Sequence, residues 1–166
     1  MAVRTVLTLG HPVLAAVSIA IGELGGWTKE LAIDLVDTMR ASPGCVGLAA
    51  PQIGVGVRAM AVDVTGHPKA RSCHGEFVLF NPEVIRSGDP VSAREGCMSV
   101  PDLTGTVTRA AAVVISGTSP QGDHVVLHAD QFEARAILHE IDHLDGLVFL
   151  DRVASAEAIF RRKTYQ

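Results

Sequence analysis

The segment His139-Glu140-Ile141-Asp142-His143 places the strongest constraint on how this chain can fold. Residues four positions apart lie on one face of an α-helix, so a helix here brings His139 and His143 to one metal ion. Glu140 beside them could then move protons. The pattern H-E-x-x-H therefore predicts a helix that carries a metal-dependent hydrolytic site. The alternative is an ordinary amphipathic helix with two histidines at its edge.

The neighbouring residues predict that this helix covers residues 131–146. Asp130 is expected to cap its start and Gly146 to end it. At about 100° per residue, Phe132 and Ala136 share a sector with the two histidines. Three aliphatic residues fall on the opposite side and are expected in the core: Ile137, Ile141 and Leu144. One face therefore suits a site and the other a packed core.

A metal site needs a further protein ligand, and Cys97 stands out for its setting in Glu95-Gly96-Cys97-Met98-Ser99. Gly96 allows the backbone an unusual conformation or a close approach. A thiolate with two imidazoles leaves a fourth tetrahedral position for water, as in catalytic sites. The alternative for Cys97 is a small buried hydrophobe, which is the commoner role of a single cysteine.

A third cluster lies at residues 47–54 and combines glycine and small residues with one amide, Gln52. The small residues allow another backbone or a substrate to lie close. Gln52 could donate a hydrogen bond to a developing oxyanion. Alternatively, the cluster is a tight turn between a helix and a strand, with Gln52 solvated or bonded to backbone.

In this order the three clusters resemble the motifs of the peptide deformylase family. That family carries G-x-G-x-A-A-x-Q, E-G-C-x-S and Q-H-E-x-D-H, which correspond here to residues 45–52, 95–99 and 138–143. The resemblance extends from about Val6 to Val153. Three ordered motifs with matching spacing are far more specific than H-E-x-x-H alone.

Two positions depart from the family pattern. Cys45 stands at the first glycine of the first motif, where it could crowd the substrate-binding edge or pack as a small hydrophobe. Leu138 replaces the glutamine before the first histidine and points about 100° away from the imidazoles on a helical wheel. We expect Leu138 to affect the support of the site and not its chemistry. Substrate preference and rate are the properties that these departures could change.

The resemblance implies that Cys97, His139 and His143 bind one divalent metal ion, Fe(II) in the cell, with Zn, Ni or Co able to occupy the site. It also implies the reaction, which is removal of the formyl group from the N-terminal formylmethionine of newly made polypeptides, with release of formate. Glu140 would transfer the protons. The Gln52 amide and the Met98 backbone N–H would stabilise the oxyanion.

The substrate is expected to pair as an extra strand with exposed sheet edges. By resemblance, the edge residues are Val46, Gly47 and Glu95. Arg109 would orient Glu95 or the substrate backbone, unless it forms only a surface salt bridge. Phe132 and Ala136 are candidates for the wall of the methionine pocket, with plain core packing as the alternative.

The length of 166 residues predicts a single catalytic domain over residues 1–166. The net charge of −4 gives no reason to expect specific nucleic-acid binding. Three cysteines and the absence of a long apolar run favour a cytoplasmic protein without a membrane segment.

Residues 13–21 are the one candidate secretory signal, which we interpret as an N-terminal arm. The basic residues 161–163 could touch the ribosome transiently or form a frayed end.

The order of elements predicts the fold class. Thr28 is expected to cap a helix that runs to about Arg40. Strands are expected at residues 55–64, 76–85, 104–108, 112–116 and 125–128, around turns at Gly105 and residues 120–122. Strands followed by a late helix, without strand–helix alternation, indicate an α+β fold with antiparallel sheets. The deformylase resemblance agrees, because that fold packs antiparallel sheets around the central metal-binding helix.

Two alternative functions are compatible with parts of the sequence. The first is a different H-E-x-x-H metallopeptidase, which would need neither the first nor the second motif. The second is a deformylase-like paralogue with altered specificity or low activity. The presence of Gln52, Cys97 and Glu140 with both histidines favours retained chemistry over the second alternative.

Overall fold

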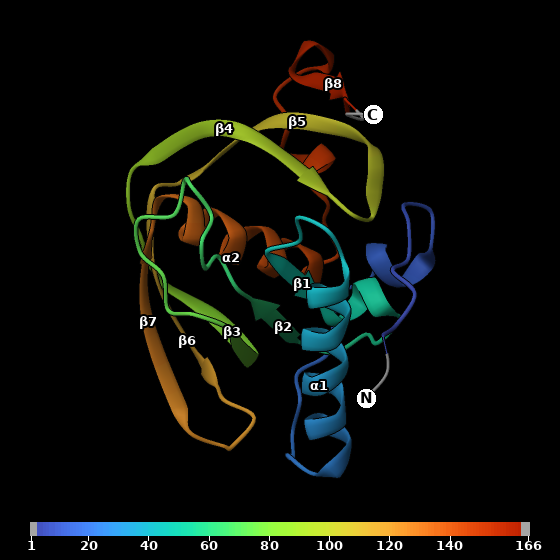
Figure 1. Ribbon diagram of the computed structural model, residues 1–166, viewed down its shortest axis with the longest axis vertical. Coiled ribbons are helices and arrows are strands. Elements are labelled where there is room, and N and C mark those ends of the chain that lie inside the picture. The colour runs from blue at the N-terminus through green and yellow to red at the C-terminus, as the bar shows by residue number, and fades with distance from the viewer. Residues whose placement is uncertain (1–2, 164–166) are drawn as a thin grey trace.

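A computed structural model describes residues 3–163 and shows an α+β architecture with two antiparallel sheets (Figure 1). The five-stranded sheet has the order β1-β2-β3-β6-β7, formed by β1 (Gly47–Ala49), β2 (Ala59–Val62), β3 (Phe77–Ser87), β6 (Ala112–Thr118) and β7 (His124–Asp130). The three-stranded sheet has the order β4-β5-β8, formed by β4 (Pro90–Cys97), β5 (Val100–Ala110) and β8 (Ile159–Arg161). The predicted fold class is confirmed.

Two α-helices pack against the larger sheet, and the second of them lies between the two sheets (Figure 1). They are α1 (Gly26–Ala41) and α2 (Gln131–Leu144). The connections include short 3-10 turns: η1 (Pro12–Ala15), η2 (Ala50–Ile53), η3 (Phe149–Arg152) and η4 (Ala156–Ala158). None of the helices within residues 3–163 is long and apolar enough to cross a membrane.

Strand β2 shows how the sheet separates two cores. Side chains alternate across a strand, so neighbouring residues of β2 face opposite helices. Ala61 packs in the core with Leu35 of α1, whereas Met60 packs in the core with Ile137 of α2. The aliphatic face predicted for α2 is therefore buried against the sheet, and its opposite face is left for the site.

The predicted helix ends are confirmed only in part. Gly146 follows α2 in the left-handed region, with φ of 75°, and thus ends the helix as predicted. Asp130 occupies the N-cap position, but its carboxylate accepts a hydrogen bond from Ser72 N–H and does not cap the helix. Thr28 is not the cap of α1. It lies in the first turn, where its hydroxyl bonds to both the N–H and the C=O of Gly25.

The smaller sheet was only partly predicted. Gly105 lies inside β5, where it pairs with Glu95 and Ile159, so the predicted turn at Gly105 is wrong. Strands β4 and β8 of this sheet are not predicted, and neither is β1 of the larger sheet. β1 and β8 have three residues each. β4 is mostly exposed, and its polar residues lack the apolar alternation that marks a half-buried strand.

Replacing Gly105 with alanine should lower the free energy of unfolding by about 1–3 kcal/mol, because a Cβ here overpacks the core. That Cβ would lie 2.8 Å from Val153 Cγ1 and 2.9 Å from Cε2 of the fully buried Phe149. Gly22→Ala is the matched control, since a Cβ there meets no atom within 4 Å. Urea unfolding of both variants measures the difference. Equal stabilities would show that Phe149 moves freely and that the packing is not tight.

Candidate metal centre and active site

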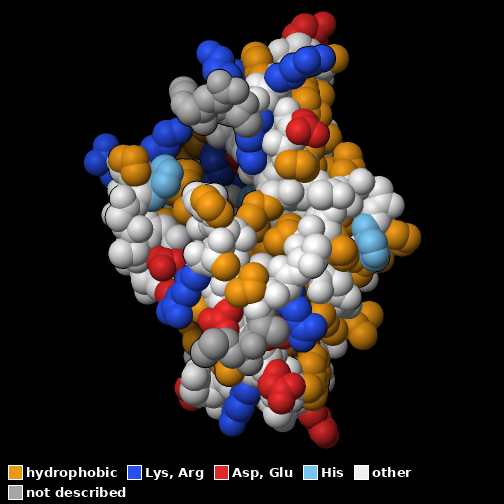
Figure 2. Space-filling model, turned by 45° about the vertical axis from the view of Figure 1, so that its right-hand side comes forward, with side chains coloured by type: hydrophobic (Ala, Val, Ile, Leu, Met, Phe, Trp, Pro, Cys, Tyr) orange, Lys and Arg blue, Asp and Glu red, His pale blue; other side chains and the backbone are white. Residues whose placement is uncertain are grey.

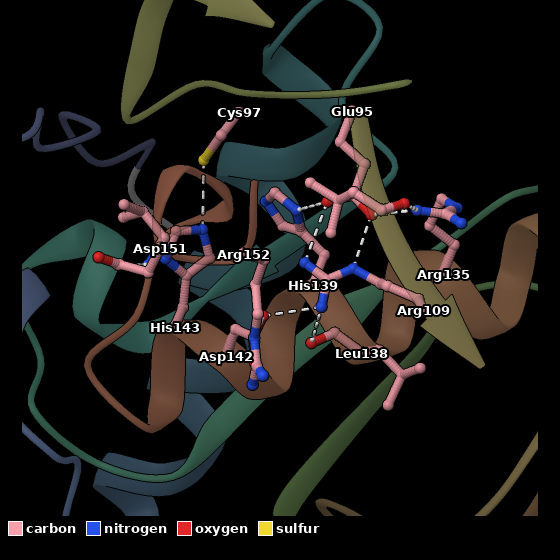
Figure 3. Close-up of polar contacts among 12 residues, drawn as sticks. Glu95, Cys97, Arg109, Arg135, Leu138, His139, Asp142, His143, Asp151 and Arg152 are labelled. Carbon is pink, nitrogen blue, oxygen red and sulfur yellow. Dashed lines mark hydrogen bonds and ion pairs between the residues drawn. The ribbon is translucent and has the colours of Figure 1, made fainter. Parts of the chain in front are cut away.

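A cysteine and two histidines come together between the two sheets (Figure 3). Cys97 ends β4, and His139 and His143 lie one turn apart on α2. One ligand atom from each lies within 4.8 Å of the others, and Cys97 Sγ is 3.2 Å from His143 Nε2. Burial lowers the pKa of His143 to about 3, so its imidazole is neutral. For His139, burial alone would lower the pKa, but hydrogen bonds with Cys97 and Glu95 outweigh burial and raise the pKa to about 10, so a metal ion would have to displace a proton from this ring. This donor set is fit to hold one metal ion.

Glu95 fixes the orientation of His139. Its Oε2 lies 2.9 Å from His139 Nδ1, so the other ring nitrogen is left for the Cys-His-His group. Burial alone would raise the pKa of Glu95. Hydrogen bonds from His139 and Arg109, together with the charge of Arg109, instead lower that pKa to about 2. The carboxylate is therefore charged and is a strong acceptor for the ring N–H.

Arg109 links Glu95 and Asp142 in one buried network of ion pairs beside the site (Figure 3). Its guanidinium donates to Glu95 Oε1 at 2.6 Å and Oε2 at 3.0 Å, and to Asp142 Oδ2 at 2.7 Å. Arg135 donates to Glu95 Oε1 at 2.7 Å from the other side. Arg109 is only 7% exposed, so the alternative of a surface salt bridge is wrong.

Gln52 is held by hydrogen bonds at both ends of its amide. Its Oε1 accepts from Ala49 N–H at 2.9 Å, and its Nε2 donates to Ser99 Oγ at 3.1 Å. The same Nε2 lies 3.5 Å from Cys97 Sγ. Gln52 is buried, so the alternative of a solvated side chain is wrong, whereas the alternative of a bond to backbone is confirmed by Ala49 N–H. The donor end of the amide points to the Cys-His-His group.

Glu140 lies against the backbone of the first motif. Any Cβ at Gly47 would collide with the Glu140 carboxyl group, so only glycine leaves room for this approach. No described residue forms a hydrogen bond with Glu140 Oε2. Burial raises the pKa of Glu140 to about 7. A carboxyl group with this pKa can both accept and donate a proton near neutral pH.

A pocket of about 250 Å³ opens beside this group, and Figure 2 shows a hollow with Lys and Arg side chains around it. The edges of both sheets and the adjoining η2 contribute predicted site residues to its lining: Val46, Gly47, Gln52, Glu95, Cys97 and Met98. α2 contributes Phe132, Ala136, His139 and Glu140. Arg109 and His143 do not line it, but each contacts a residue that does.

The structure locates Phe132 and the two residues that depart from the family pattern, Cys45 and Leu138. Phe132 lines the pocket and also packs against the core of α2, and its ring stacks on His67 with centroids 3.8 Å apart. Cys45 lines the pocket too, and its thiol donates to Gly47 C=O at 3.0 Å. Leu138 packs against the core of α2 and is absent from the lining. Cys45 is thus the departure that lies in the pocket.

Four charged residues near the site were not predicted. Arg135 could have been found, because it precedes His139 by four positions and shares its helical face. Asp142 also lies within the motif. Arg94 and Arg162 line the pocket as well, but no local pattern shows that the end of the chain returns to this place.

Comparisons with known proteins identify the family. A family model described as polypeptide deformylase matches residues 3–158. A peptide deformylase of Desulforudis audaxviator is 43% identical over 164 residues, which cover 98% of this chain and 99% of that protein. A crystal structure of peptide deformylase from Ehrlichia chaffeensis in complex with actinonin has a TM-score of 0.88 and 28% identity, and the match covers 95% of this chain and 92% of that one.

A Met-Ala-Ser-bound class I type b peptide deformylase from Acinetobacter baumannii has a TM-score of 0.83 and 30% identity, over 92% of this chain and 99% of that one. The likeness therefore includes both sequence and fold, and this chain adds a buried Cys-His-His group that is fit to hold a metal ion. This likeness excludes the alternative function of an unrelated H-E-x-x-H metallopeptidase. The protein is a metal-dependent hydrolase with peptide deformylase activity, and the chain belongs to the peptide deformylase family.

Proposed function

We propose that Cys97, His139 and His143 hold one divalent ion, which is Fe(II) in the cell and can be replaced by Zn, Ni or Co. The donor set supports this, because one thiolate and two imidazoles suit all of these ions. A bound ion supplies a Lewis acid that lowers the pKa of a water molecule and polarises the formyl carbonyl. Glu95 keeps His139 in the tautomer that binding requires.

Glu140 acts as the proton-transfer residue in this proposal. It takes a proton from the attacking water, whose oxygen adds to the formyl carbon, and passes that proton to the nitrogen as the C–N bond breaks. The products are formate and a free N-terminal methionine. The position of Glu140 in the lining and its pKa of about 7 support this role.

Gln52 and Met98 stabilise the negative charge on the formyl oxygen. The Gln52 amide supports this role because both of its ends are fixed by hydrogen bonds and its donor end points to Cys97. Donors that are held in place before the reaction stabilise a developing oxyanion without reorganisation. Met98 follows Cys97 directly and lines the pocket, so its backbone N–H is the second donor that we propose.

The substrate is a formyl-Met polypeptide that lies as an extended chain between two sheet edges. β1 and β4 are both edge strands, and both border the pocket. Val46, Gly47 and Glu95 are the residues whose backbones would pair with the substrate. Phe132 and Ala136 would form the wall beside the methionine, and Arg109 would act by holding Glu95. The Acinetobacter structure with bound Met-Ala-Ser supports a peptide of this kind.

We further propose that the chain acts as one catalytic domain on newly made polypeptides in the cytoplasm. A transient ribosome contact through the basic residues 161–163 stays a prediction. Of these three residues, Arg161 pairs with Leu103 in the sheet and Arg162 N–H donates to Asp102 C=O, so the alternative of a frayed end is wrong for both. Hydrogen bonds to β5 thus hold the backbone of this segment as far as Arg162.

Formate release from formyl-Met-Ala-Ser tests the proposed function. Protein purified without oxygen and loaded with Fe(II) should release formate, and removal of the ion by a chelator should lower the rate at least about a hundredfold. Cys97→Ser should bind the ion more weakly, which metal analysis after dialysis would detect. Equal rates with and without the ion would contradict the proposal.

A further inference from the structure

Strand β8 positions Arg162 at the opening of the active-site pocket. β8 pairs with β5 through Arg161 opposite Leu103, Phe160 opposite Thr104 and Ile159 opposite Gly105. The backbone then continues with Arg162 N–H, which donates to Asp102 C=O at 2.8 Å. The backbone of Arg162 is therefore fixed by the sheet.

The side chain of Arg162 reaches the pocket by crossing β4 at Gly96. A Cβ built on Gly96 would collide with the Arg162 guanidinium, so the missing side chain is what makes room for it. Arg162 lines the same pocket as Cys97, His139 and Glu140. A residue near the end of the chain thus becomes part of the substrate site.

A second arginine, Arg94, lies beside Arg162 in the pocket lining. Arg94 precedes Gly96 by two positions in β4, so both project from the same face of the strand. Its guanidinium lies 3.7 Å from the ring centroid of Phe160, a cation–π contact that holds it against β8. Arg94 also lines the pocket. The rim over β4 therefore carries two guanidinium groups from different strands.

Nothing among residues 3–163 neutralises these two charges. Neither Arg94 nor Arg162 forms an ion pair with a described carboxylate. Of the carboxylates in the pocket lining, Glu95 is already paired with Arg109 and Arg135, and Glu140 lies against Gly47. The rim can thus accept a negative charge from a ligand.

We propose that Arg162 and Arg94 are a specificity-determining pair that favours substrates with Asp or Glu among the first three residues after the formylmethionine. The inference rests on the proposed function. A peptide that pairs with the edge of β4 carries its later side chains past Gly96, and alternate side chains point to the face on which the two arginines lie. Arginine binds a carboxylate through two parallel hydrogen bonds, so a peptide carboxylate is a well-matched ligand.

The test compares isosteric peptides that differ in one charge. Formyl-Met peptides with Asp or Asn at the second, third or fourth position are compared by kcat/KM at low salt. We expect the parent protein to prefer Asp about three- to tenfold at one of these positions or more. Arg162→Gln should reduce this ratio to about one, and Arg94→Gln should reduce it partly. Arg161→Gln is the matched control, because it removes the same charge from a neighbour that does not line the pocket.

Two results would overturn the proposal: an Asp-to-Asn ratio of one at all three positions, or a ratio that Arg162→Gln leaves unchanged. Calorimetric affinities of the unformylated Met peptides test the pair independently of turnover and should follow the same ratios. If no peptide released formate but the affinities depended on Arg162, the proposed function would be contradicted. The preference of the two arginines for acidic peptides would still be supported.

Discussion

Glu140→Gln should lower the rate of formate release by about 10²–10⁴-fold and leave the bound metal in place. The substitution keeps the shape of the side chain and removes only the ability to carry a proton. Glu140 is not one of the three metal donors, so metal content should be unchanged. No described residue donates to Glu140 Oε2, so the free energy of unfolding should not fall either. Single-turnover formate release and metal analysis on the same sample measure both effects.

Two controls sharpen this experiment. Glu157→Gln changes an exposed carboxylate outside the pocket and should behave as the parent protein. Glu140→Ala should lose activity to a similar extent as Glu140→Gln, because both lack the proton-transfer group. A Glu140→Gln protein that kept near-full activity with metal bound would remove Glu140 from the mechanism.

Arg109→Met should lower the free energy of unfolding by about 3–5 kcal/mol, the largest loss of stability that we expect from one substitution here. The change removes the shared partner of Glu95 and Asp142 and leaves two carboxylates buried beside each other. Chemical unfolding in the presence of a chelator measures the loss without a contribution from metal binding.

Arg152→Met is the matched control, because Arg152 also pairs with Asp142, at 2.7 Å, but its side chain is 47% exposed. Water screens such a pair, so the expected loss is under about 1 kcal/mol. Similar losses for both variants would show that the burial of Arg109 does not govern its contribution. A small loss for Arg109→Met would mean that the remaining partners are sufficient, namely Arg135 and His139 for Glu95 and Arg152 for Asp142.

The parts of the site that the sequence could predict are those governed by local geometry. His139 and His143 share a helical face because of their spacing, and the aliphatic residues of α2 pack opposite them for the same reason. The residues around Cys97 and the family resemblance indicate Cys97 as the third donor. Its distance from the histidines depends on how β4 packs over α2, which no spacing in the sequence reveals.

The parts that could not be predicted depend on contacts between distant segments. Glu95, Arg109 and Asp142 come from two strands and a helix. The contact of Arg109 with Glu95 is expected only through the family resemblance, and only the folded chain shows that Asp142 joins them. Gly105 was predicted as a turn from its residue type, but tertiary packing against Phe149 is what requires glycine there. Strand β8 is too short to recognise, so the return of Arg162 to the pocket had no signal in the sequence.

The two free edges beside the pocket also bear on how this protein behaves at high concentration. An exposed strand edge can pair with the edge of another copy and start aggregation. Here β1 has only three residues, and β4 begins with Pro90 and carries Arg94 near its middle. Short, charged or proline-containing edges resist such pairing. The chain can therefore present two open backbones to a passing peptide while it discourages its own copies from joining them into a continuous sheet.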